Sequence, residues 1–471
     1  MANYIWTLYG ILTIVSFWLI FNKANEKGWK AVIPFYNIFI ALKIVNRPWW
    51  WLIIFLIPGV NIFMLLILFV QLIKSFGKYD FKTLTIGMLL APAYLLYVGV
   101  KDNFKYVGPS GSEEYRKNRK KSKSKEWTDA LVFAAIAATI IRWFMIEAYT
   151  IPTSSMERSL LVGDFLFVSK LNYGPRIPNT PLAFPFAHHT MPIIKTKSYL
   201  EWIKVGYHRL PGFEKIENND VVVFNYPMED FRPVDKKENY IKRCLAIAGD
   251  TLEIVDRKIL INGKHEKLPD KGQYRYFVKT NGQGFRPGLL HSIGISDYQQ
   301  LMGELGSYVM FMTNENAEEI KNLASVTKVE PIIESANNFD SRVFPFYEEL
   351  RWNMDNFGPI YIPKKGDKIE MNEANFHIYR RAIMIYENNP SLEMKNAQVF
   401  LENEPIDYYT FKMNYYWLMG DNRHNSLDSR FWGFVSEDHV VGKALFLWMS
   451  WDKDGKGINK IRWDRIFNGI H

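Results

Sequence analysis

The sequence predicts a chain with two unlike halves: an N-terminal α-helical transmembrane region followed by a mainly β domain, into which a mixed α/β domain is inserted. Long apolar runs crowd the first 150 of the 471 residues, and short β-like runs come after them. A stretch from 251 to 415 mixes strand-like and helix-like pieces. A chain of this length is enough for two or three structural units.

The first two apolar runs predict membrane-associated helices. Tyr4 to Phe21 has no basic region before it and no clear cleavage site, so it reads as a retained span rather than a removed leader. A mixed basic and aromatic segment, Lys23 to Arg47, is typical of an interfacial segment. The second run, Trp49 to Ile73, is interrupted by Pro58-Gly59, which indicates either a kinked span or a re-entrant hairpin.

A third apolar run, Leu84 to Val100, completes the region. Residues 1–110 are therefore expected to form an N-terminal membrane domain with about three apolar spans. Its role cannot be inferred from the sequence.

A basic tract sets the expected orientation. The formal net charge is +9, and many of the positive charges lie in 116–125, directly before the fourth apolar run, Ala130 to Ile146. Such a surplus of positive charge could bind nucleic acid or anionic lipid, or it could set the orientation of the chain in a membrane. Its position favours topology, with 111–127 as a cytoplasmic linker and 128–147 as the transmembrane anchor of the β domain. No nucleic-acid partner is expected.

After residue 150 the pattern changes to strands. Asp220 to Phe224 and Val440 to Trp448 are typical of buried strands. Residues 148–250 and 416–471 are predicted to form the two parts of one core, with 251–415 inserted between them. The single cysteine, Cys244, cannot form an intramolecular disulfide and is expected to be buried and structural.

Three segments carry chemistry: 149–156 (YTIPTSSM), 239–243 (NYIKR) and 420–430 (GDNRHNSLDSR). A serine hydroxyl needs a base to become a nucleophile, and a lysine can be that base only when neutral. Lys242 stands in an apolar, strand-like setting, where burial disfavours the ammonium. The fixed charge of Arg243 is expected to disfavour it further.

These segments, in this order and after a membrane anchor, resemble those of the bacterial type I signal peptidase family. The resemblance implies that Ser155 is the nucleophile and Lys242 the general base of a Ser-Lys dyad. It also implies that Ser426 orients the lysine and that Thr153, with the Ser155 backbone N–H, forms the oxyanion hole. The matching segments cover about a quarter of the chain.

The resemblance assigns structural and binding roles as well. Arg243 is expected to pair with Asp421, and Asp428 with Arg430. The shallow substrate pockets are expected to be lined by Ile151, Tyr240 and Ile241. No cofactor and no metal are expected; His188-His189 has no acidic or cysteine ligand at a helpful spacing.

The chain departs from the family pattern in four places. Ser154 stands where the family has glycine, which makes it a rival nucleophile. Arg158 replaces a common proline, Asn219 stands at a left-handed turn that usually has glycine, and His424 replaces an acidic residue. If Lys242 were not the base, a histidine mechanism through His424 or His439 would be the alternative.

The resemblance implies an integral-membrane serine endopeptidase, signal peptidase I, in the bacterial cytoplasmic membrane. Its mainly β catalytic domain would be extracytoplasmic, and its partners would be exported preproteins with signal peptides, the phospholipid membrane and the nearby export translocase. Two alternatives are a non-cleaving membrane-anchored β scaffold and a Ser-Lys autoprotease. Which preproteins are cut, the role of the insert and the oligomeric state stay open.

Overall fold

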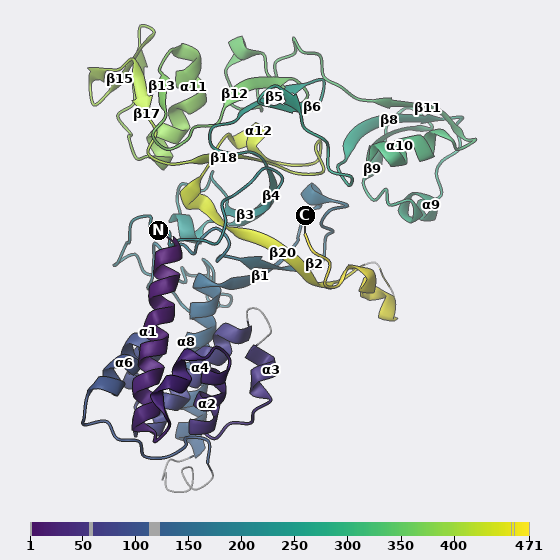
Figure 1. Ribbon diagram of the computed structural model, residues 1–471. Helices are drawn as coiled ribbons and strands as arrows, with labels where there is room; N and C mark the ends of the chain where they lie inside the picture. The colour runs from purple at the N-terminus through teal and green to yellow at the C-terminus, as the bar shows by residue number, and fades with distance from the viewer. Residues whose placement is uncertain (1, 56–59, 113–122, 454, 456, 471) are drawn as a thin grey trace. The chain divides into compact units, whose positions relative to one another are not determined.

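The computed structural model describes residues 2–55, 60–112, 123–453, 455 and 457–470. The chain divides into two compact units, Met1–Met145 and Ile146–His471, each of which can be followed in Figure 1. The border lies where the last helix of the first unit ends and the first strand of the second begins.

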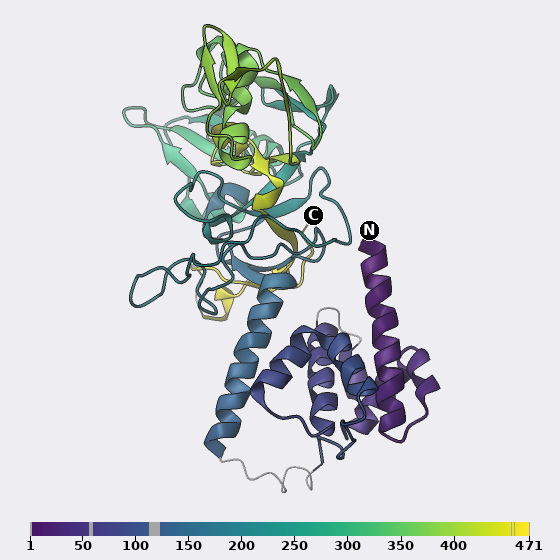
Figure 2. The same cartoon turned by 90° about the vertical axis from the view of Figure 1, so that its left-hand side faces the viewer.

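The first unit is helical. Its N-terminal helix α1 packs against α2 and α6, and α4 packs against α2, α5 and α6. Figure 2 shows the helices of this unit from a second direction, with α1 in purple. Their contact is a core of large apolar side chains that includes Phe17, Phe21 and Phe69. The helices are α1 (Ala2–Lys23), α2 (Tyr36–Ile44), α3 (Trp51–Phe55), α4 (Val60–Ser75), α5 (Phe81–Leu89), α6 (Ala91–Val100) and α8 (Lys123–Phe144).

The third predicted span is not one straight helix. The segments Lys82–Met88 and Ala91–Val100 meet at an angle of 116°. Pro92 explains the break: it lies in the first turn of α6, where proline lacks only a hydrogen bond that a helix start would not make. By length and composition this bent pair passes as a membrane span, whereas no single helix among the described residues does.

The predicted anchor, 128–147, corresponds to α8, which starts earlier and ends at Phe144. Ile146 already belongs to the first strand of the second unit. Most of the basic tract, and the Pro58-Gly59 break with its two alternatives, lie outside the described residues.

The second unit is built on a seven-stranded antiparallel sheet in the order β1-β2-β20-β3-β4-β18-β19. Its longest strand, β20, crosses the middle of the sheet and is drawn in yellow in Figure 1. The sheet confirms the predicted mainly β character of this half. Its strands are β1 (Ile146–Thr150), β2 (Asp164–Ser169), β3 (Val221–Asn225), β4 (Asn239–Ala246), β18 (Tyr415–Met419), β19 (Val435–Ser436) and β20 (Val440–Ser450).

The predicted strand positions agree with the structure because their sequences suit buried sheet positions. All five residues of β3 are buried, as expected for a continuous apolar run in the middle of a sheet. Asn219, just before it, has a φ of 74°, which is the left-handed conformation predicted from its place in the family pattern. Cys244 lies fully buried in β4.

The segment 251–415 forms smaller sheets within the same compact unit. Part of it shares a hydrophobic core with the ends of β4 and β18, through side chains such as Leu252, Phe357 and Trp417. The strands and helix of this part are β5 (Thr251–Val255), β6 (Lys258–Ile261), β7 (Lys264–His265), β12 (Phe357–Tyr361), β13 (Lys368–Glu370), β14 (Glu393–Lys395), β15 (Gln398–Leu401), β16 (Glu404–Pro405), β17 (Tyr408–Thr410) and α11 (Glu373–Arg381).

A second part of this segment, residues 274–331, is here named the β8–β11 lobe. It has its own core around Val278, Met310 and Ile320. Figure 1 shows its sheet together with its two short helices. Its elements are β8 (Tyr274–Thr280), α9 (Pro287–Ser292), β9 (Tyr298–Gln300), β10 (Ser307–Met312), α10 (Asn314–Lys321) and β11 (Val326–Pro331).

Candidate active site

Ser155 lies on a tight turn that comes after β1. The single helical turn Ser154–Met156 buries Ser155 and seats Met156, which is fully buried, in the core beneath the sheet. The backbone N–H of Asn422 donates to the Ser155 carbonyl at 3.1 Å, and the Asn422 side chain donates to the Ser154 carbonyl at 3.2 Å. Asn422 therefore holds the turn through two hydrogen bonds.

Lys242 reaches this turn from β4. It pairs with Val222 of β3 and is only 3 % exposed. Its Nζ lies 2.7 Å from Ser155 Oγ and 2.9 Å from the Ile241 carbonyl oxygen. A hydroxyl and an amine at this separation are within proton-transfer reach.

Burial lowers the pKa of Lys242 to about 8, although the negative charges of Asp428 and Asp421 oppose the shift. The expected contribution of Arg243 is not found. Its guanidinium donates to both carboxylate oxygens of Asp421, at 2.9 and 2.7 Å, so the negative charge of Asp421 neutralises the positive charge of Arg243.

A second buried ion pair lies close by. Arg430 donates to the two carboxylate oxygens of Asp428 at 2.9 and 2.8 Å, and Asp428 also accepts from the Gly420 N–H at 3.1 Å. Burial by itself would raise the pKa of Asp428, but Arg430 outweighs it and holds this pKa below the ordinary range. Both pairs that the resemblance implied are therefore present, and Arg243–Asp421 joins β4 to the loop after β18.

The rival serine, Ser154, has a different environment. Its Oγ accepts a hydrogen bond from the Asn425 side chain at 3.2 Å, while Lys242 Nζ is directed to Ser155. The geometry thus distinguishes the two hydroxyls, and it favours Ser155.

The hydroxyls that the resemblance assigns to the oxyanion hole and to orienting the lysine, those of Thr153 and Ser426, both lie at the site. Thr153 is exposed beside Ser155 and lines the cleft. Ser426 Oγ is buried and makes no hydrogen bond to Lys242. The role that the resemblance gives it stays a prediction. Gly420 allows the close approach here, since a Cβ on it would lie 2.2 Å from Ser426 Oγ and 2.5 Å from the Ser155 carbonyl oxygen.

A cleft of about 420 Å³ opens at Ser155. The three predicted pocket residues, Ile151, Tyr240 and Ile241, all line it. The remaining wall is formed by Tyr149, Thr150, Pro152, Thr153, Ser154, Ser155, Met156, Leu166, Val223, Glu238, Asn239, Lys242, Asn425 and Leu427. Most of this lining is apolar, which suits small uncharged side chains.

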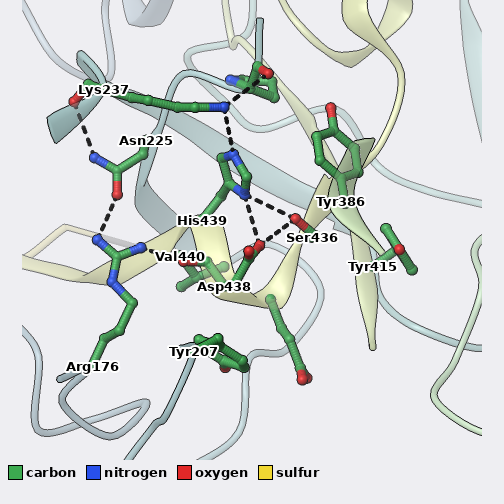
Figure 3. Close-up of polar contacts among 12 residues, drawn as sticks. Arg176, Tyr207, Asn225, Lys237, Tyr386, Tyr415, Ser436, Asp438, His439 and Val440 are labelled. Atoms are coloured by element: carbon green, nitrogen blue, oxygen red, sulfur yellow. Dashed lines mark hydrogen bonds and ion pairs between the residues drawn. The ribbon is translucent and has the colours of Figure 1, made fainter. Parts of the chain in front are cut away.

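Neither histidine of the alternative mechanism bonds to Ser155. His424 Nε2 lies 2.8 Å from Asp355 Oδ1, in a pair that is almost fully buried. Figure 3 shows His439 in a separate buried cluster. Its Nδ1 lies 2.7 Å from Asp438 Oδ1 and 2.9 Å from Ser436 Oγ, and its Nε2 lies 3.1 Å from Lys237 Nζ. These contacts occupy both ring nitrogens of His439.

Sequence reasoning missed the residues that tie distant segments to the nucleophile turn. Ser159 donates to Asp421 at 2.7 Å, and Ser296, far along the chain, donates to Glu157 at 3.1 Å. Asn422 and Asn425 stand inside the third motif, where the continuous run of polar residues could have indicated contacts to the turn. For Ser296 no sequence signal exists, because its contact depends on how the β8–β11 lobe folds.

Comparison with known proteins gives two family matches. Residues 124–349 and 362–451 match the family described as signal peptidase, peptidase S26. Residues 29–109 match a family of unknown function (DUF5684).

Several relatives match about two thirds of the chain. "Signal peptidase I" of Buchnera aphidicola (from Acyrthosiphon pisum) is 28% identical over 68% of this chain and 73% of its own. The protein of the same name from Pseudomonas aeruginosa is 25% identical over 69% of this chain and 72% of its own, and the one from Aquifex aeolicus is 24% identical over 68% and 82%. With a family match over most of its length, the chain belongs to the signal peptidase family, peptidase S26, and is a hydrolase of the peptidase class.

Proposed function

We propose that this enzyme removes N-terminal signal peptides from exported preproteins, with Ser155 as the nucleophile and Lys242 as the general base. The observation that carries the proposal is the 2.7 Å approach of the buried Lys242 Nζ to Ser155 Oγ at the floor of an apolar cleft. The lowered pKa of Lys242 supports it, because a base must be neutral near the working pH.

In the acylation step, neutral Lys242 takes the proton of Ser155 as Oγ attacks the scissile carbonyl carbon. The resulting oxyanion would be met by the Ser155 backbone N–H and the hydroxyl of Thr153, which lines the cleft. Lys242 then gives its proton to the leaving amine, and the peptide bond breaks. The signal peptide remains bound to Ser155 Oγ as an ester.

Deacylation reverses the roles. Water enters, Lys242 takes one of its protons, and the hydroxide attacks the ester carbonyl. The ester bond to Ser155 breaks, the released carboxyl end belongs to the signal peptide, and Oγ regains a proton from Lys242. The apolar lining by Ile151, Tyr240 and Ile241 favours substrates with small residues before the scissile bond.

The proposed location is the bacterial cytoplasmic membrane, with several spans and the catalytic half outside. The apolar helices of 1–145 and the basic residues before α8 support this orientation. A surface in 182–203 supports a phospholipid partner: Phe184, Phe186 and Trp202 are 57, 62 and 82 % exposed, and Lys195, Lys197 and Lys204 lie in or beside the same stretch. A position near the export translocase is expected from the substrate class.

The test is cleavage of a purified preprotein by the full chain in detergent or lipid vesicles. Mass spectrometry of the product should give one new N-terminus at the end of the signal peptide. Ser155→Ala should give none, and Ser154→Ala, one residue away and equally conservative, is the matched control. Uncut preprotein with folded wild-type enzyme would contradict the proposal.

A further inference from the structure

The β8–β11 lobe contacts the residue that follows the nucleophile turn, through the hydrogen bond from Ser296 to Glu157, and its Asp297 carboxylate accepts a hydrogen bond from a residue that lines the cleft. Asn425, which lines the cleft, donates to Ser154 Oγ at 3.2 Å and also to Asp297 Oδ2. Asp297 lies just before β9 and therefore belongs to the inserted segment rather than to the seven-stranded sheet.

The Asp297 carboxylate is held in place by the lobe's own fold. The Phe311 N–H donates to the Asp297 carbonyl at 3.0 Å, and Ile295, two residues earlier, is buried in the lobe core. The Asn316 side chain fixes the turn at Ile293 through a 2.8 Å hydrogen bond to its carbonyl. The carboxylate is therefore a fixed charge at this wall rather than one on a loosely held loop.

No cation pairs with Asp297 in the described parts of the chain. The Arg158 guanidinium contacts the lobe at Gly294, where a Cβ would lie 1.7 Å from it, but it makes no ion pair with Asp297 among the described residues. The negative charge of Asp297 acts on Glu157, the residue that follows the nucleophile turn. Burial raises the pKa of Glu157, and repulsion from Asp297 raises it further. Glu238, the acidic residue that lines the cleft itself, is already paired with His189 at 2.9 Å and Arg232 at 3.5 Å.

The cleft lining is of two chemical kinds. Ile151 and Ile241 are apolar, whereas Ser154 and Asn425 are polar and hydrogen-bonded to each other at 3.2 Å. Under the proposed function, on which this inference rests, the apolar lining takes the small residues before the scissile bond. The residues after the bond then leave past Asn425, next to the Asp297 carboxylate.

We propose that Asp297 determines specificity on the leaving side of the substrate: the enzyme prefers preproteins whose mature chain begins with a basic or neutral residue and discriminates against an acidic one. A single charge near a protein surface changes such rates by about five- to tenfold, and added salt weakens the effect. The preference comes from the inserted lobe, so it is a property of this chain's insert rather than of the dyad.

The experiment uses the full chain and three peptides that are identical except for the first residue after the scissile bond, which is Lys, Asn or Asp. Asn and Asp have the same shape, so their difference reports charge alone. Wild-type kcat/KM should fall in the order Lys, Asn, Asp, with about a tenfold span that narrows at about 1 M salt. In Asp297→Asn, whose amide oxygen can still accept from Asn425, the Lys/Asp ratio should fall to near one. In Asp297→Lys it should invert.

Glu319→Gln is the matched control, because Glu319 is an exposed carboxylate on α10 of the same lobe, with no part in the cleft. It should keep the wild-type Lys/Asp ratio. An unchanged ratio in Asp297→Asn, or a wild type that cuts the Asn peptide but does not discriminate Lys from Asp, would overturn this inference and leave the proposed function intact. A wild type that fails to cut the Asn peptide would overturn both.

Discussion

Lys242 Nζ lies 2.7 Å from Ser155 Oγ, although 87 positions of sequence separate the two residues. The contact depends on β4 lying beside β3 in the middle of the sheet and on the turn after β1 folding back over it. Two buried ion pairs, Arg243–Asp421 and Arg430–Asp428, fix the loop that closes the site from the other side. The segments that carry the proposed dyad are therefore held in place by sheet pairing and by two buried ion pairs.

The nucleophile is tested by replacing each serine of the turn separately. We expect Ser155→Ala to lower kcat by about 10⁴ or more, since only binding and oxyanion terms remain, while Ser154→Ala changes it by less than about tenfold. Cleavage assays on one preprotein with both variants, after circular dichroism shows that each is folded, are sufficient. Substantial activity in Ser155→Ala would move the nucleophile to Ser154.

The proposed oxyanion donor is tested at Thr153. Removing its hydroxyl in Thr153→Ala should lower kcat by about 10²–10³ with little change in KM, because the donor acts on charge that develops only in the transition state. Thr153→Ser, which keeps a hydroxyl, should be mild. Steady-state kinetics on a peptide substrate separate the two parameters; an unchanged kcat in Thr153→Ala would mean that other groups form the hole.

The buried pair Arg243–Asp421 should matter for stability as well as for geometry. Asp421→Ala leaves the Arg243 guanidinium, which is 4 % exposed at its side chain, without its partner and should destabilise the protein by about 3–5 kcal/mol. Denaturant unfolding measures this loss. Asp270→Ala is the control, because the Lys267–Asp270 pair is almost fully exposed and should contribute nothing measurable. Equal losses of unfolding free energy in Asp421→Ala and Asp270→Ala would contradict the stabilising role of the Arg243–Asp421 pair.

Two buried histidines should make the fold sensitive to mild acid. Burial lowers the pKa of His424 and of His439, although Asp355 and Asp438 respectively oppose the shift. The folded pKa values therefore lie below the unfolded value near ~6.5, so the unfolded chain binds more protons and stability is lost as pH falls below that value. Lys237, Arg176, Arg430 and Arg275 add repulsion to a charged ring.

Melting temperatures of the full chain at pH 7.5 and 5.5 check this. We expect the drop between the two pH values to be smaller in His439→Gln than in wild type. His208→Gln, at an exposed position, should keep the wild-type drop. If His439→Gln showed the same drop in melting temperature as wild type, His439 would not be the cause of the pH dependence of stability.

The sequence predicted the mainly β sheet, and it placed the candidate site residues in three short motifs, because the evidence for both was local. Strands such as β3 are continuous apolar runs, and the motifs around Ser155, Lys242 and Asp421 each lie within a few residues. The left-handed turn at Asn219 was predictable from one residue type in one position.

The features that could not be predicted depend on contacts between distant segments. The balance of Arg243 by Asp421 removes its expected effect on the pKa of Lys242, and only the folded geometry shows which charge is neutralised. The position of Asp297 beside Asn425 depends on the β8–β11 lobe, whose sequence has no motif. Pro92 is a local sequence signal for a new helix start, but it lies inside a continuous apolar run, which was interpreted as one span.

The most direct test of the account is the pH dependence of kcat/KM for wild type and Lys242→Arg on one peptide. In the proposed mechanism the neutral amine is the active form. Because burial lowers the pKa of Lys242 to about 8, cleavage should rise with pH through an apparent pKa near that value. Lys242→Arg should be inactive throughout, because guanidinium stays protonated. An active Lys242→Arg, or a wild-type profile that is flat between about pH 6.5 and 9.5, a range set about 1.5 units either side of that pKa, would contradict the dyad.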